Sequence, residues 1–176
     1  TNTGEDVIFK YILDNGSFSE EIIVKKIFGA PILLFEDESD NYSDYWTIDS
    51  SWSETFEEYN SPQTSITDSP YSNYSNNALE TINLLNDINL SGYSYAEINF
   101  NAKWNIESGY DYVQIEISND NGASWEPQCG KYTRKGIETQ EDALDEPLYD
   151  GNQGEWVNAV SYTHLRAHET KWHRVC

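Results

Sequence analysis

The sequence predicts an all-β protein, an antiparallel β-sandwich preceded by two strands of a neighbouring domain. In several short segments, apolar and polar residues alternate with a period of two, which is typical of half-buried strands. Turn sequences rich in Gly, Asn, Asp and Pro separate these segments. Aromatic residues make up 14% of the 176 residues, and this content argues against disorder despite the high charge.

The first expected element is a hairpin of two strands, at residues 7–13 and 21–28, joined by a turn at residues 14–17. Two strands cannot bury a face by themselves. Residues 1–29 are therefore predicted to be the end of a preceding β-sandwich domain. Gly29, Ala30 and Pro31 break the alternation, and we place the domain boundary there.

The main domain is expected at residues 30–159 and to begin with a strand at residues 32–35. Four consecutive apolar residues there are typical of a strand buried on both faces. Residues 39–62 show little periodicity and are predicted to form a loop-rich segment. Its aromatic side chains are expected to be anchors: Trp46, Trp52, Phe56 and Tyr59.

Further strands are expected near residues 65–67, 78–90 and 96–106, and from Trp156 onward. Residues 78–90 also fit a short helix. Their Asn and Asp residues are poor helix formers, so a strand is preferred.

A hairpin is predicted in the middle of the chain, with its turn at residues 118–125. The octet SNDNGASW resembles an Asp-box, the S-x-D-x-G-x-[ST]-W hairpin of secreted bacterial β-proteins. Asn121 and Gly122 suit the positive backbone dihedrals of a tight turn. Asp120 is predicted to accept hydrogen bonds from loop amides, which is a structural role.

Charge excludes several classes of partner. The chain carries 31 Asp and Glu against 10 Lys and Arg, a formal net charge of -21. This field repels nucleic acid and anionic lipid, so we expect no nucleic-acid partner. No apolar run approaches the roughly 18 residues of a membrane span, so no membrane insertion is expected. The composition instead suits solubility outside the cell and calcium coordination, and the resemblances given below imply a secreted or cell-surface bacterial protein.

Residues 160–176 differ in character from the rest. They hold all three His residues, and the string SYTHLRAHET resembles a translated sequencing-adapter read-through. This tail is therefore predicted to be non-native. On a helix, His164 and His168 would share one face, with Glu169 and His173 nearby, but the resemblance argues against a metal site there.

Short stretches in a fixed order carry a second resemblance. They occur at residues 27–31, 35–37, 65–70, 103–107, 111–113, 129–132 and 147–151. Over about residues 5–158 the chain resembles the C-terminal region of secreted Bacteroidetes-type zinc carboxypeptidases. In that family a MAM-like or immune-inhibitor-A-like jelly-roll module follows the catalytic domain. The family's D-G-W-Y-x-D-D ending is missing here, so the resemblance implies an antiparallel jelly-roll that is truncated at its C-terminus.

The resemblance also implies a partner, the catalytic domain of the parent chain. A zinc carboxypeptidase site needs a His-x-x-Glu pair and a distant His, and residues 1–163 contain no His. The fragment is therefore expected to be non-catalytic and to hold no zinc. Glu107, Asp111, Glu116 and Asp120 contain possible glycosidase pairs, but chance pairs are plentiful in so acidic a chain.

A calcium site is predicted from Glu36, Asp37, Asp68 and Asn73. Three carboxylates brought together repel one another unless a cation neutralises them. The alternative is a solvated acidic rim. Such a site is expected to rigidify the module.

Contacts to an extracellular protein or glycan are predicted for Trp52 and Tyr71, because both lie in loops. Trp104 and Trp125 lie in apolar alternation and are expected in the core. Cys129 is expected to be a small buried hydrophobe. The alternative function is a glycan- or protein-binding module of a cell-surface adhesin.

Overall fold

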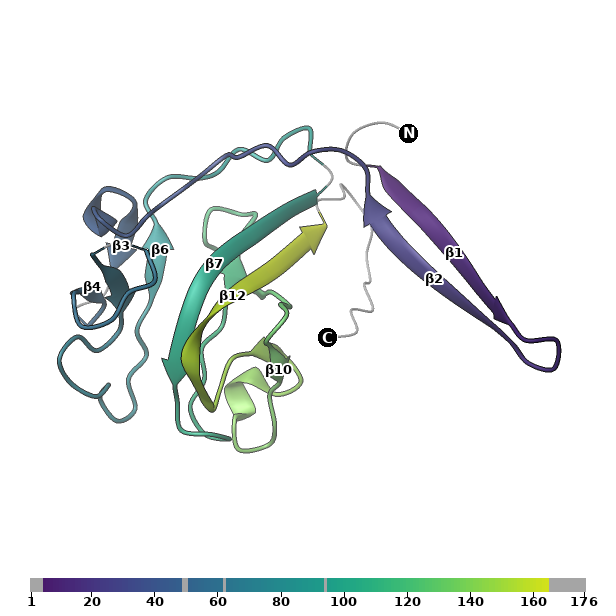
Figure 1. The fold of residues 1–176 in the computed structure, drawn as a ribbon. Coiled ribbons are helices and arrows are strands. Elements are labelled where there is room, and N and C mark those ends of the chain that lie inside the picture. The colour runs from purple at the N-terminus through teal and green to yellow at the C-terminus, as the bar shows by residue number, and fades with distance from the viewer. Residues whose placement is uncertain (1–4, 49–50, 62, 94, 165–176) are drawn as a thin grey trace. The chain divides into compact units, whose positions relative to one another are not determined.

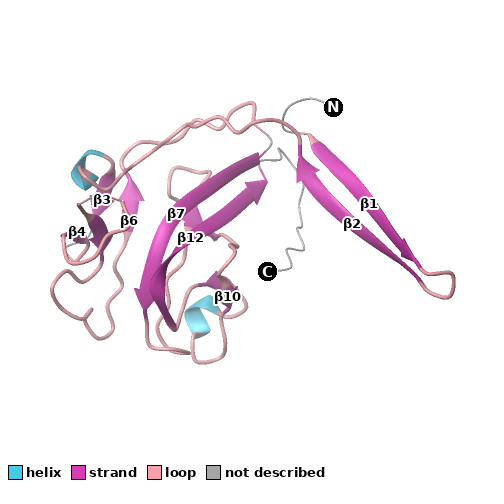
Figure 2. Ribbon diagram, in the orientation of Figure 1, coloured by secondary structure: helices cyan, strands magenta, loops and turns pink. Residues whose placement is uncertain are grey.

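The computed structural model describes residues 5–48, 51–61, 63–93 and 95–164 (Figure 1). The fold is all-β, as the sequence predicts, and every pair of strands is antiparallel. Within those ranges the helical elements are two single 3-10 turns, η1 (Tyr42–Asp44) and η2 (Glu141–Ala143), seen in Figure 2. No helix in the described ranges has the length and apolar character to span a membrane.

The chain divides into two compact units. One combines Thr1–Pro31 with Leu90–Cys176, and the other is Ile32–Asn89. The division groups the N-terminal hairpin with residues 90–176, and the separate domain expected at residues 1–29 stays a prediction. The sequence pattern indicates no division at Asn89, because the strands on either side of it alternate in the same way.

The N-terminal hairpin consists of β1 (Asp6–Asp14) and β2 (Ser19–Ile27), paired from Asp6 with Ile27 to Asp14 with Ser19. Its turn is closed by side chains. Asp14 Oδ1 accepts from the Gly16 amide at 2.7 Å, and Asn15 Oδ1 accepts from the Phe18 amide at 2.9 Å. The hairpin predicted from alternation and turn residues is confirmed.

The longest strands of the first unit pair with each other. They are β7 (Tyr95–Asn105) and β12 (Asn152–His164), with a register shift between Gln153 and Val157 (Figure 1). β12 runs past Val160 into the first residues of the expected non-native tail. His168, Glu169 and His173 lie outside the described residues.

Four short strands complete this unit. They are β8 (Glu116–Ile117) with β9 (Glu126–Pro127), and β10 (Arg134–Lys135) with β11 (Pro147–Leu148).

Tyr149 is the centre of the first unit's core. It is 4% exposed, and its ring lies 5.2 Å from that of Trp104 and 6.3 Å from that of Phe100, both edge-on. Trp104 therefore packs in the core, as predicted. The prediction for Trp125 is wrong, since its side chain is 48% exposed and lies over Gly122 of its own turn.

Cys129 also differs from expectation. It is half-buried and disulfide-bonded, so the prediction of a small buried hydrophobe is wrong. Cys176 lies outside the described residues.

The second unit contains two short strand pairs. They are β3 (Trp46–Ile48) with β6 (Ile82–Leu84), and β4 (Ser53–Thr55) with β5 (Ser65–Thr67). The strand predicted at residues 78–90 is thus reduced to β6.

The strand predicted at residues 32–35 is wrong. This segment has no strand conformation, and Ile32, Leu33 and Leu34 are 64%, 71% and 45% exposed. A strand needs a neighbouring strand to pair with, and an apolar composition does not provide one. The strands of this unit, β3 with β6 and β4 with β5, pair with one another and not with residues 32–35. Phe35 is less exposed than these three, and its ring lies 5.5 Å from that of Tyr45.

Candidate functional site

The central turn is held by the carboxylate of Asp120. Its Oδ1 accepts from the Ser124 amide at 2.9 Å, and its Oδ2 accepts from the Ser124 hydroxyl at 2.6 Å. The Ser118 hydroxyl donates to Asp120 Oδ1 at 2.8 Å, and Ser118 Oγ accepts from the Gly122 amide at 2.7 Å. Asn121 and Gly122 have φ values of 60° and 79°, as a tight turn requires. The carboxylate therefore organises the turn.

These hydrogen bonds, the Ser124 hydroxyl first, lower the pKa of Asp120 to about 2. A lowered pKa in the folded protein stabilises the fold above the unfolded value, near 3.9, and this stabilisation is lost as the pH falls toward 2. We expect Asp120→Asn to flatten the acid limb of stability between about pH 4 and pH 2. Urea unfolding of both proteins across this range measures it, and parallel curves would contradict the assignment.

A second carboxylate, that of Asp150, is enclosed by donors. Its side chain is 4% exposed. Arg134 Nε donates to Oδ1 at 2.6 Å, and Arg134 Nη2 donates to Oδ2. Oδ2 also accepts from the Gly109 amide at 2.7 Å and from Gln140 Nε2 at 3.3 Å. With donors on both oxygens, this carboxylate joins β10, the residue before η2 and the loop that follows β7.

Charge and backbone contacts reinforce the Asp150 network. The Arg134 hydrogen bonds lower the pKa of Asp150, and Asp150 in turn raises the pKa of Arg134. The Asp150 carbonyl accepts from Trp104 Nε1 at 3.1 Å, which joins the network to the aromatic core. Sequence reasoning missed this pair. The one available signal was an Arg in a strongly acidic region.

The four predicted calcium ligands are not brought together. Asp37 accepts from the Ser39 amide at 2.8 Å and from Trp46 Nε1 at 2.7 Å, whereas Asp68 accepts from the Ser69 hydroxyl at 2.9 Å. Glu36 and Asn73 are exposed. Within the described ranges, no three His, Cys, Asp or Glu side chains are grouped as metal ligands. Calcium binding by these residues stays a prediction.

The carboxylates considered for hydrolysis have different environments. Asp120 is engaged in its turn, as described above. Burial raises the pKa of Glu116, and the charge of Glu146 raises it further. Glu146 itself accepts from Gln114 Nε2 at 3.0 Å.

Of the two predicted contact residues, Trp52 directly precedes β4 and Tyr71 lies in the loop that follows β5. Tyr71 is 68% exposed, whereas Trp52 is half-buried and its indole N–H is buried without a hydrogen-bond partner in the described part of the chain. Phe56 and Tyr59 were expected as anchors, but they are 61% and 49% exposed. We call the loops that carry Phe56, Tyr59 and Tyr71 the aromatic loops.

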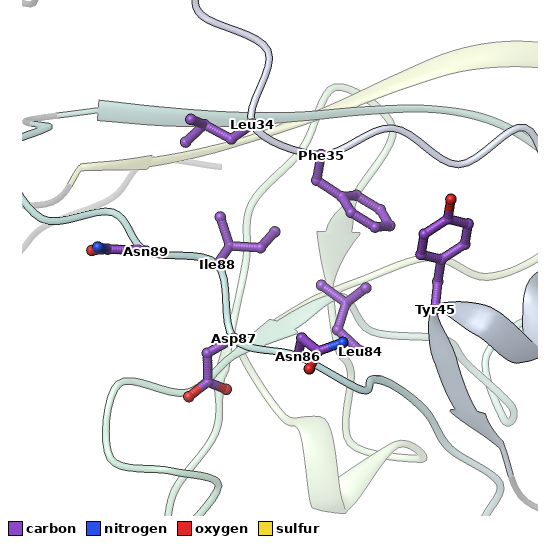
Figure 3. Close-up of a pocket in the computed structure, with 8 residues that line it drawn as sticks. All are labelled: Leu34, Phe35, Tyr45, Leu84, Asn86, Asp87, Ile88 and Asn89. Atoms are coloured by element: carbon purple, nitrogen blue, oxygen red, sulfur yellow. The ribbon is translucent and has the colours of Figure 1, made fainter.

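The second unit also contains an apolar pocket of about 400 Å³. The lining residues are Leu34, Phe35, Tyr45, Leu84, Asn86, Asp87, Ile88 and Asn89 (Figure 3). In Figure 3 the side chains of Phe35, Leu84 and Ile88 point toward a common space, and the Asp87 carboxylate points away from it. The pocket thus offers apolar contacts and places no charge at its centre.

Comparisons with protein-family models, with curated proteins and with solved structures find no match to this chain. The resemblance to a metallopeptidase module stays a prediction.

Proposed function

We propose that the chain is a non-catalytic binding module of a secreted bacterial metallopeptidase, with a zinc carboxypeptidase as the parent. The observation that carries the binding role is the exposure of Phe56, Tyr59 and Tyr71 on loops beside one strand pair. Exposing large aromatic side chains to water costs free energy, and exposed aromatic groups are typical of recognition surfaces.

Hydrogen bonds hold these loops against the strand pair. The Tyr71 amide donates to Glu57 Oε2 at 3.0 Å, and the Ser65 hydroxyl donates to the Glu58 carbonyl at 2.6 Å. Both contacts link the loop after β4 to β5 or to the loop that follows it. A surface that is ordered before binding loses less conformational entropy when a ligand binds.

The charge of the chain defines the ligand class. A net charge of -21 disfavours anionic partners. Aromatic rings stack on the apolar faces of sugars, so a neutral extracellular glycan fits the aromatic loops best. In the parent protein, the module would position the catalytic domain on such a surface, and bound calcium would rigidify it.

The carboxylates with lowered pKa values are consistent with a non-catalytic role. Asp120 and Asp150 are ionised and bound by donors of their own fold. A general acid or base needs a pKa near the working pH and a position beside the substrate.

A cell-surface adhesin is the second candidate parent. The aromatic loops favour it to the same degree, since an adhesin would present the same surface. The two candidates differ only in the domains that accompany this module.

Affinity electrophoresis of the full chain in gels containing neutral polysaccharides tests the binding role. We expect retardation by at least one polysaccharide, and we expect Tyr71→Ala to weaken it roughly three- to tenfold. Tyr110→Ala is the matched control, since Tyr110 is 60% exposed in the other unit. Migration unaffected by every polysaccharide, or an equal loss in both variants, would refute the proposal.

A further inference from the structure

The N-terminal hairpin has two different faces. Side chains alternate between faces along a strand, and directly paired residues share a face. Face 1 is defined by Val7, Phe9, Tyr11 and Leu13 of β1 with Glu20, Ile22, Val24 and Lys26 of β2. Face 2 carries Ile8, Lys10 and Ile12 of β1 with Glu21 and Ile23 of β2.

Both faces expose apolar side chains, since Ile8, Ile12 and Ile23 of face 2 are 60%, 61% and 58% exposed, but face 1 has no charged side chain in its middle. On face 1, Phe9, Tyr11, Leu13 and Ile22 are 45%, 53%, 57% and 41% exposed. Face 2 has an ion pair in its middle, between Lys10 Nζ and Glu21 Oε2 at 2.6 Å. An isolated hairpin is marginally stable in water, so burial of face 1 would stabilise it considerably.

The charges of face 1 lie at its two ends. Glu20 is beside the turn and Lys26 is beside the open end, about 20 Å apart along β2. When two copies of face 1 are stacked with their strands running in opposite directions, Glu20 of each copy lies over Lys26 of the other. A two-fold axis between the sheets and perpendicular to the strands produces that reversal.

We propose that face 1 is the interface of a homodimer in which β2 packs antiparallel over β2 of a second copy. Ile22 then lies over Val24 of the second copy. Glu20 meets Lys26 of the second copy, and the symmetry repeats this ion pair at the opposite end.

The alternative two-fold axis, parallel to the strands, is disfavoured. It would place Glu20 over Leu13 and Lys26 over Val7, and so set both charges against apolar side chains without a partner. The interface of a two-stranded face is smaller than the roughly 1,000 Å² of a stable complex. The dimer is therefore weak, with a dissociation constant in the micromolar range or above.

Sedimentation equilibrium of the full chain over a range of concentrations tests the dimer. Each of these single variants, Glu20→Lys and Lys26→Glu, places two like charges opposite each other at both ends of the dimer interface. We expect each variant to raise the dissociation constant of the dimer about tenfold. The double variant exchanges the two charges and should restore wild-type association. Both residues are exposed, and far-ultraviolet circular dichroism checks that the variants fold.

A second pair of variants distinguishes the faces. Leu13 and Ile12 are adjacent, 57% and 61% exposed, and on opposite faces. Leu13→Thr should weaken the dimer and Ile12→Thr should not. A chain that remains monomeric at every concentration, or a double charge variant that fails to restore association, would overturn the proposal. Equal effects of the two Thr variants would overturn it as well.

Discussion

Gly136→Ala is expected to destabilise the unit formed by β7 to β12 by about 3 kcal/mol, because the added methyl group meets backbone that cannot move aside. A Cβ at this position would lie 2.0 Å from the Ala143 carbonyl oxygen and 3.1 Å from Leu148 Cδ2. Gly136 is buried, and its amide donates to the Glu146 carbonyl at 2.9 Å. The close approach of two backbone segments thus requires glycine.

Urea unfolding of Gly136→Ala measures this loss, and the melting temperature should fall by roughly 10 °C. Gly154→Ala is the matched control. Its nearest neighbour to an added Cβ would be Asn152 Oδ1 at 3.5 Å, an ordinary contact distance. Equal stability of the two variants would show that the segments near Gly136 are not packed as described.

The second large effect is expected from Asp150→Ala, also about 3 kcal/mol, because it removes the carboxylate that pairs with Arg134 and accepts from Gln140 and the Gly109 amide. Arg134 is 37% exposed, so water screens part of the lost attraction and the value stays at the lower end for such pairs. Glu155→Ala, which removes an exposed carboxylate from β12, is the control and should change stability little.

The effect of Asp150→Ala should depend on pH. The pKa of Asp150 is lowered in the folded protein, chiefly by Arg134. Its contribution is therefore complete above the unfolded pKa near 3.9 and is lost as the pH falls through the folded value. Unfolding free energies of wild type and variant should differ most above about pH 5 and converge in acid. A difference that grows in acid would contradict this ion pair.

Local patterns predicted the elements that local interactions stabilise. The first hairpin follows from alternation and from the Asp14 and Asn15 side chains that close its turn. The Asp120 turn follows from one octet whose residues hydrogen-bond to one another. In both cases every partner lies within a few residues, so the sequence alone carries the information.

Contacts between distant segments were not predictable in this way. Arg134 and Asp150 are 16 residues apart, and Gly109 reaches Asp150 from 41 residues away. The segment at residues 32–35 was expected to be buried because of its composition, yet burial requires strands on either side, which composition cannot supply. The exposure of Trp125, Phe56 and Tyr59 has the same origin, since aromatic residues serve either a core or a binding surface.

Loop position predicted the exposure of only one of the two expected contact residues. Tyr71 was proposed for an exposed contact because it lies in a polar loop, and the structure exposes its side chain. Trp52 was proposed for the same reason, but its buried indole N–H shows that loop position alone does not determine exposure.

We propose that this module accompanies a metallopeptidase, and long reads of the encoding DNA test that proposal. We expect a catalytic domain with a His-x-x-Glu pair and a distant His in the same reading frame upstream. We also expect the frame to depart from the present sequence near residue 160. A complete frame without such a domain would refute the proposal and leave the adhesin as the parent.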